Sequence, residues 1–77
     1  MKNKSKTYQQ RIQETRKDKD IGQKEIAEHL KITQQQYSLY ETGKRTFPAD
    51  LIPQICLYLQ VSSDYILGLP KGMTWPK

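Results

Sequence analysis

IGQKEIAEHLKITQQQYSLYETGKR, residues 21–45, contains two short amphipathic segments joined by a brief link. Apolar residues recur at helical spacing in the first segment and predict a helix over about 23–30: Ile26, Ala27 and Leu30. The second segment begins with a threonine followed three residues later by a glutamine, the spacing of a capping box, and this predicts a helix over about 34–41. Two short helices joined by a three-residue turn are the arrangement of a helix-turn-helix.

The side chains of this unit divide into an inward and an outward set. Ala27 supplies the small residue that is needed where two helices cross. Several residues are spaced to face a common core: Ile26, Leu30, Ile32, Tyr37 and Tyr40. The outward side of the second helix then exposes four residues together: Gln34, Gln35, Ser38 and Leu39.

A further helix is predicted before this unit and two after it. Thr7 and Gln10 have the capping-box spacing and open a helix over about 8–19. The segment LIPQICLYLQV, residues 51–61, has helical periodicity although it contains a proline. SDYIL, residues 63–67, predicts a last short helix, which Ser62 caps and Gly68 ends.

Pro53 fixes where the fourth helix begins. Proline in a helix interior costs about 3 kcal/mol, but in the first turn its missing N–H is no loss. With Asp50 as N-cap, Leu51 is the first helical residue and Pro53 the third. Five short helices without a strand pattern predict an all-α bundle.

Length and composition limit the possible functions. A chain of 77 residues forms one small domain, which we place at 7–69 between a flexible basic arm at 1–6 and a tail at 70–77. No apolar run is long enough to span a membrane, and the single cysteine and single histidine supply no metal site. We therefore expect a cytoplasmic protein that is not an enzyme and uses no metal and no cofactor.

The net charge of +5 is unevenly distributed. Residues 1–24 contain eight Lys or Arg and three Asp or Glu, whereas residues 25–77 contain five of each. A small basic domain favours nucleic acid as a partner. The lysines of the arm, Lys2, Lys4 and Lys6, are interpreted either as a solvated tail or as a segment that wraps DNA.

Residues 21–45 resemble the helix-turn-helix of the lambda-repressor-like family, which comprises phage repressor and Cro proteins and their xenobiotic-response-element-type bacterial relatives. The resemblance continues through FPADLIPQICLYLQVSSDYILG and covers roughly residues 8–69. It implies a compact five-helix DNA-binding fold and a transcriptional regulator that binds operator DNA, usually as a dimer. One departure is Lys31, because the family commonly has glycine there for a left-handed backbone.

The resemblance also implies roles for individual residues. Thr33 opens the recognition helix, and Gln34 and Gln35 occupy positions that contact base edges in some relatives. Gln23 would contact a phosphate and brace that helix, while Lys44 and Arg45 would approach the phosphate backbone from a loop. Two residues match a structural ion pair of the family, Arg16 and Glu41. We add Lys24 to the backbone contacts and Ser38 and Leu39 to the base contacts.

The chemistry of the glutamines agrees with these roles. An amide offers a donor and an acceptor in one plane, which suits adenine N6 and N7 in the major groove, and a good bidentate pair discriminates by about 1–3 kcal/mol. Leu39 stands where many relatives have a base-contacting Arg or Gln, and leucine can only make apolar contact with a thymine methyl. Basic side chains would meet phosphates and set the register.

Alternatives exist for most of these residues. Gln34, Gln35 and Ser38 could be solvated helix residues, Gln36 a cap rather than a DNA contact, and Tyr37 and Tyr40 core residues. His29 is interpreted as a solvated residue on an outer face. The alternative function is a protein-interaction module, or an antitoxin-like partner-binding protein, with weak or no DNA binding.

A homodimer on a pseudo-palindromic operator, acting as a repressor, is the expected form, together with a possible protein partner and no membrane. The apolar residues of the last two helices and the tail suggest the dimer interface: Tyr58, Tyr65, Ile66, Leu69 and Trp75.

Overall fold

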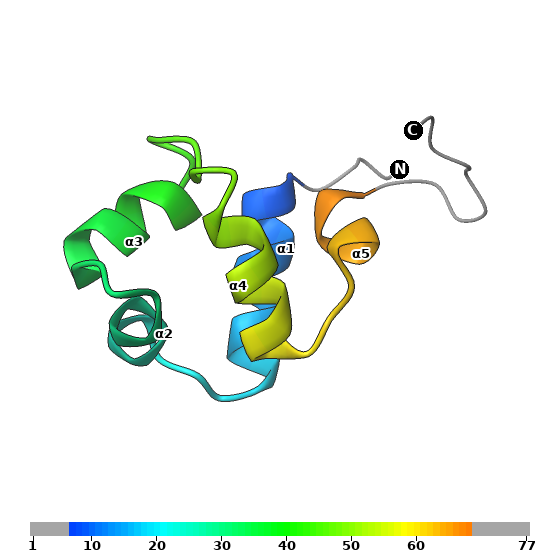
Figure 1. The fold of residues 1–77 in the computed structure, drawn as a ribbon, viewed down its shortest axis with the longest axis horizontal. Coiled ribbons are helices and arrows are strands. Elements are labelled where there is room, and N and C mark those ends of the chain that lie inside the picture. Colours follow the sequence, from blue (N-terminus) through cyan, green and yellow to red (C-terminus); the bar gives the residue numbers. More distant parts are fainter. Residues whose placement is uncertain (1–6, 69–77) are drawn as a thin grey trace.

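A computed structural model of the chain describes residues 7–68. Within that range it contains helices and no strand: α1 (Tyr8–Asp18), α2 (Gln23–Leu30), α3 (Gln34–Glu41), α4 (Leu51–Leu59) and α5 (Ser63–Leu67). The predicted all-α class is confirmed. Figure 1 shows α2 and α3 on one side of the central pair α1 and α4, with α5 on the other side. The expected basic arm and tail, with Leu69 and Trp75, lie outside the described residues.

Both predicted capping boxes are present. The Thr7 hydroxyl accepts a hydrogen bond from the Gln10 N–H at 3.1 Å, and the Gln10 side chain accepts from the Thr7 N–H at 2.9 Å. Thr33 and Gln36 repeat the pattern at 3.0 and 3.1 Å. These reciprocal bonds satisfy N–H groups that the first turn of a helix leaves without a partner, so α1 and α3 begin where the sequence predicts.

The start of α4 is predicted correctly but for a partly wrong reason. The helix begins at Leu51, and Pro53 lies in its first turn. The Asp50 side chain, however, makes no capping hydrogen bond, and its backbone is helical, with φ −74° and ψ −12°. The Leu51 and Ile52 N–H groups donate instead to the Pro48 and Ala49 carbonyls, at 3.0 and 3.3 Å. A preceding backbone turn therefore supplies the acceptor that the carboxylate was expected to provide.

Three helices are followed by a residue with a left-handed backbone that is not glycine. These residues are Asp20 (φ 59°), Lys31 (φ 63°) and Gln60 (φ 59°). The residue after each donates its N–H to the carbonyl five positions back, at 3.1, 3.0 and 3.0 Å: Ile21 to Arg16, Ile32 to Ala27 and Val61 to Cys56. A left-handed backbone at a residue other than glycine costs about 1–2 kcal/mol relative to glycine. Because the following apolar side chain packs against the core, burial offsets that cost.

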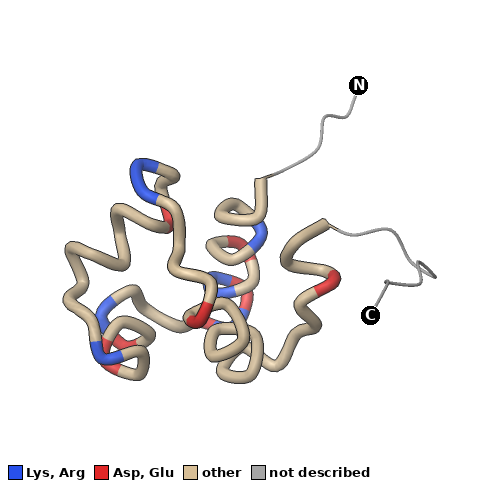
Figure 2. Tube along the Cα trace, turned by 45° about the horizontal axis from the view of Figure 1, so that its top comes forward, with Lys and Arg blue, Asp and Glu red and all other residues tan. Residues whose placement is uncertain are grey.

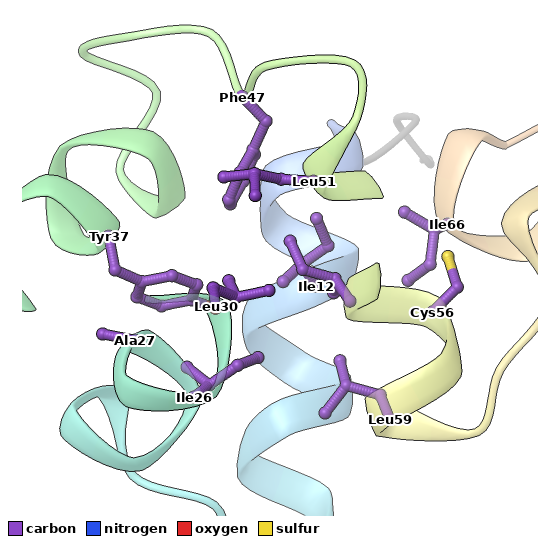
Figure 3. Packing of buried hydrophobic residues seen from close by; sticks show 11 residues of the cluster. Ile12, Ile26, Ala27, Leu30, Tyr37, Phe47, Leu51, Cys56, Leu59 and Ile66 are labelled. Carbon is purple, nitrogen blue, oxygen red and sulfur yellow. The ribbon is translucent and has the colours of Figure 1, made fainter. Parts of the chain in front are cut away.

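The core forms where all five helices meet (Figure 3). Its buried residues are Ile12, Ile26, Ala27, Leu30, Tyr37, Phe47, Leu51, Ile55, Cys56, Leu59 and Ile66. Ile32 and Tyr40 pack against it while half-buried, so the predicted inward set is confirmed. Cys56 is a free, buried cysteine, and burial raises the pKa of its thiol.

One expectation about the surface is wrong, and another is incomplete. Ile66 has an exposed fraction of 0%, so it belongs to the core of one chain and is not available to a dimer interface. His29 is exposed but not merely solvated, because its ring stacks on Tyr58 with centroids 4.2 Å apart. The Tyr58 hydroxyl donates to the Glu25 carboxylate at 2.7 Å, which raises the pKa of Tyr58 and links α2 to α4.

Candidate nucleic-acid interface

A buried carboxylate fixes α3 from behind. Glu41, with an exposed fraction of only 3%, receives two hydrogen bonds from the Arg16 guanidinium: Nε to Oε2 at 2.9 Å and Nη2 to Oε1 at 3.0 Å. Gln23 Nε2 donates to the same Oε1 at 2.9 Å, and the Tyr37 hydroxyl donates to Oε2. One carboxylate thus joins α1, α2 and α3. We call these four residues, Arg16, Gln23, Tyr37 and Glu41, the Glu41 network.

The Glu41 network keeps its ion pair charged. Burial by itself would raise the pKa of Glu41, but the hydrogen bonds from Arg16, Tyr37 and Gln23 outweigh burial and lower it. The hydrogen bonds to Glu41 likewise raise the pKa of Arg16. For Tyr37, burial and the hydrogen bond it donates to Glu41 both raise the pKa. These shifts keep Arg16 and Glu41 charged and Tyr37 neutral, the states in which the hydrogen bonds that hold α3 against α1 and α2 can form.

The opposite side of α3 faces solvent. Gln34 and Gln35 are exposed, and Ser38 and Leu39 are half-buried. Within the described chain, no hydrogen bond involves the side-chain amide of Gln34 or Gln35. Their donors and acceptors are therefore available to a ligand. Thr33 and Gln36 are exposed at the start of the helix, but their side chains are engaged in the capping box.

The loop after α3 brings cations beside this surface. Lys44 and Arg45 are exposed, and Figure 2 shows basic residues at the outer bend of the loop. The Arg45 N–H donates to the Leu39 carbonyl at 3.1 Å, so the loop turns back onto the end of α3. Gly43, with φ 85°, permits that turn.

A recess separates the outward face of α3 from this loop. It has a volume of about 240 Å³ and is lined by Gln36, Leu39, Tyr40 and Arg45. Its wall is thus part apolar, with an amide and a guanidinium beside it. We call it the Leu39 recess.

The start of α2 places two further predicted residues. Gly22 precedes the helix and provides no side-chain cap, so the first N–H groups of α2 remain open to an external acceptor. Lys24 is exposed there. Gln23 is half-buried and is committed through one N–H to Glu41, as its bracing role requires. A helix N-terminus with an adjacent lysine suits a phosphate.

Two other kinds of site are not found in the described part of the chain. Among residues 7–68, no helix combines the length and the apolar character that a membrane crossing requires. Over the same residues, no three His, Cys, Asp or Glu side chains are grouped so as to hold a metal ion.

Comparison with known proteins gives the family. Residues 9–71 match the helix-turn-helix domain family. The chain belongs to this family. It is also 34% identical over 62 residues to YobD of Bacillus subtilis (strain 168), described as an uncharacterized HTH-type transcriptional regulator. That alignment covers 80% of this chain and 55% of the relative, so the chain spans about half the length of that protein.

Within this helix-turn-helix domain, the role of Phe47 in holding the loop after α3 was not predicted from the sequence. Phe47 has an exposed fraction of 4%, although it lies in the loop between α3 and α4. The centroid of its ring lies 5.2 Å from that of the Tyr40 ring and 5.9 Å from that of the Tyr37 ring. The Phe47 backbone N–H donates a hydrogen bond to the Tyr8 hydroxyl at 3.2 Å. Phe47 therefore anchors the cationic loop. The signal was available, since this is the only phenylalanine of the chain and it stands in a polar segment.

Proposed function

We propose that this protein is a double-stranded DNA-binding transcriptional regulator that inserts α3 into the major groove. The observation that carries the proposal is the contrast across α3. The Glu41 network fixes its inner side, while exposed amides without hydrogen bonds inside the described chain lie on its outer side. The family membership and the description of YobD as an HTH-type transcriptional regulator agree with this proposal.

In this proposal Gln34 and Gln35 contact base edges, with Ser38 beside them. Glutamine pairs with the N6 and N7 atoms of adenine, and both amides are free to orient because no group of the described chain binds them. An α-helix fits the major groove, and the first turn of α3, where the two glutamines lie, is its most exposed part.

Phosphate contacts come from both ends of the helix-turn-helix. Lys44 and Arg45 would meet phosphates from the loop, and Lys24 from the start of α2. Gln23 would use its second amide hydrogen and Thr33 its hydroxyl hydrogen, since each is engaged through another atom. These contacts set the register of α3, and the glutamines supply sequence discrimination.

We further propose that two chains bind a pseudo-palindromic site and act as a repressor by occupying it. The remaining apolar surface supports a dimer. Leu57 on α4 is 79% exposed, and Tyr65 and Leu67 on α5 are 49% and 45% exposed. Burial of such side chains in a partner would be favourable. Footprinting should then show two protected half-sites about one helical turn apart.

A salt titration of duplex binding tests the central proposal. A protein that neutralises Z phosphates loses affinity with a log–log slope of about −0.9Z in salt concentration. The three cationic backbone contacts predict a slope of about −2.7 for each bound chain, to which the neutral Gln23 and Thr33 add nothing. No detectable binding to any duplex at low salt would reject the proposal and would favour the alternative, a protein-interaction module that binds through the exposed residues of α4 and α5.

A further inference from the structure

We propose that the Leu39 recess receives the 5-methyl group of a thymine, which makes Leu39 a specificity-determining residue. The inference rests on the proposed insertion of α3 into the major groove and deepens it. Its starting point is that Leu39 is an apolar residue on a face of α3 where the other side chains are polar.

Helical geometry places Leu39 on the proposed DNA side. Leu39 lies four residues after Gln35, so the two side chains occupy the same face, one turn apart. Tyr37 and Glu41, which are buried, lie on the opposite side of the helix. A ligand that contacts the amide of Gln35 is therefore next to the side chain of Leu39.

The lining of the recess indicates what kind of group could contact Leu39. Its apolar wall consists of Leu39 and the neighbouring Tyr40, and Leu39 remains partly accessible. The only apolar group that the four ordinary base pairs present in the major groove is the thymine methyl. A base edge that carries this methyl can place it against Leu39 while the rest of the edge faces the amides of α3.

The charged rim supports DNA as the occupant. Arg45 lines the recess, and its N–H donates to the Leu39 carbonyl at 3.1 Å, which fixes the loop beside the pocket. The exposed guanidinium of Arg45 and the adjacent Lys44 would attract a polyanion. An apolar floor with cations at one edge matches a thymine edge next to its phosphate backbone.

The test uses modified DNA and the full chain. A binding sequence is first selected from a random duplex pool, and each thymine in it is then replaced singly by deoxyuridine, which lacks only the methyl. We expect one position in each half-site at which the replacement weakens binding about fourfold, the effect of burying one methyl group. Replacement by 5-bromodeoxyuridine, whose bromine is similar in size to the methyl, should restore binding.

A variant comparison assigns the methyl to Leu39. Leu39→Ala should bind thymine and deoxyuridine duplexes equally, a loss of coupling that a double-mutant cycle measures. The matched control is Gln35→Ala on the same face, which should bind more weakly but retain the roughly fourfold preference for thymine.

Each outcome decides the proposal. If the wild-type chain binds DNA but tolerates deoxyuridine at every position, the recess does not hold a methyl, although the DNA-binding function stands. If Leu39→Ala retains the preference, the methyl lies elsewhere. Failure of the random pool to yield any bound sequence would reject the proposed function itself.

Discussion

Both sides of α3 carry polar side chains, but those on the inner side are buried and hydrogen-bonded, whereas those on the outer side are exposed. On the inner side, Glu41 and the hydroxyl of Tyr37 are buried, and all their hydrogen bonds lie within the protein. On the outer side, Gln34 and Gln35 are exposed and have no hydrogen-bond partner for their amides among the described residues. The difference shows that one eight-residue helix combines a side bonded to the rest of the domain with an open polar side.

If α3 is held in place on its inner side, contacts made by its outer side can be more selective. A contact that must discriminate between bases requires fixed geometry, because a mobile helix would lose entropy on binding and tolerate alternative pairings. The Glu41 network ties α3 to α1 and α2 through hydrogen bonds that need no ligand. Polar groups on the inner side therefore determine stability, whereas those on the outer side should determine binding.

A mutation that breaks the Glu41 network should have the largest effect, a loss of folding stability. Glu41→Ala leaves the Arg16 guanidinium buried without its charge partner, and we expect the free energy of unfolding to fall by about 3–5 kcal/mol. Urea denaturation followed by circular dichroism measures this. Glu28→Ala, an exposed glutamate on α2, is the control and should change stability by about 0.5 kcal/mol or less. Similar losses for the two variants would contradict the structural role.

Acid should weaken the same network more mildly. Because folding lowers the pKa of Glu41, its contribution is fully present above its ordinary value of 4.5 and is lost as the pH falls through the lower folded value. Denaturation midpoints should therefore hold from pH 7 to about 5 and fall below that range. In Glu41→Gln this contribution is absent, so a parallel acid decline in both proteins would refute the assignment.

Breaking the outer side should alter binding without altering stability. Gln34→Ala and Gln35→Ala should each reduce discrimination between the selected site and a one-base variant by about 1–3 kcal/mol. Melting temperatures should stay near the wild-type value, since both residues are exposed. Paired measurements of affinity and melting separate the two effects. A large fall in melting temperature would show that these glutamines are structural.

The smallest and least selective effect should come from the loop. Lys44→Ala with Arg45→Ala should weaken binding to all sequences alike and flatten the salt slope by about 0.9 for each phosphate that is no longer neutralised. Lys19→Ala removes one charge from the end of α1, outside the proposed interface, and should leave the slope nearly unchanged. A change in sequence preference for the loop variant would mean that the loop contacts bases.

Much of the fold follows from local signals in the sequence. The two threonine–glutamine capping boxes begin α1 and α3 at the predicted residues, because a cap depends only on side chains within one helical turn. The apolar spacing of α2 identifies Ile26, Ala27 and Leu30 as core residues for the same reason. Pro53 places the start of α4 because only the first turn of a helix tolerates it.

Other features could not be predicted in this way. The Asp50 side chain has the residue type of a cap, yet a backbone turn at Pro48 replaces it. Asp20 and Gln60 adopt left-handed backbones without the glycine that would have signalled them. The half-buried apolar residues that follow, Ile21 and Val61, offset that strain through packing, and such packing is defined only once the helices have assembled.

The sequence by itself determined the helix-turn-helix and the candidate contact residues, because helical periodicity and capping place side chains on faces without reference to the rest of the chain. The tertiary structure alone decided how those faces are used. It joined Gln23, from another helix, to the ion pair of Arg16 and Glu41, anchored the basic loop through Phe47, and formed the Leu39 recess. The Gln23 bond and the Phe47 anchor join segments that are distant in sequence, and the recess forms where the loop after α3 turns back onto that helix. In each case only packing brings the atoms into contact.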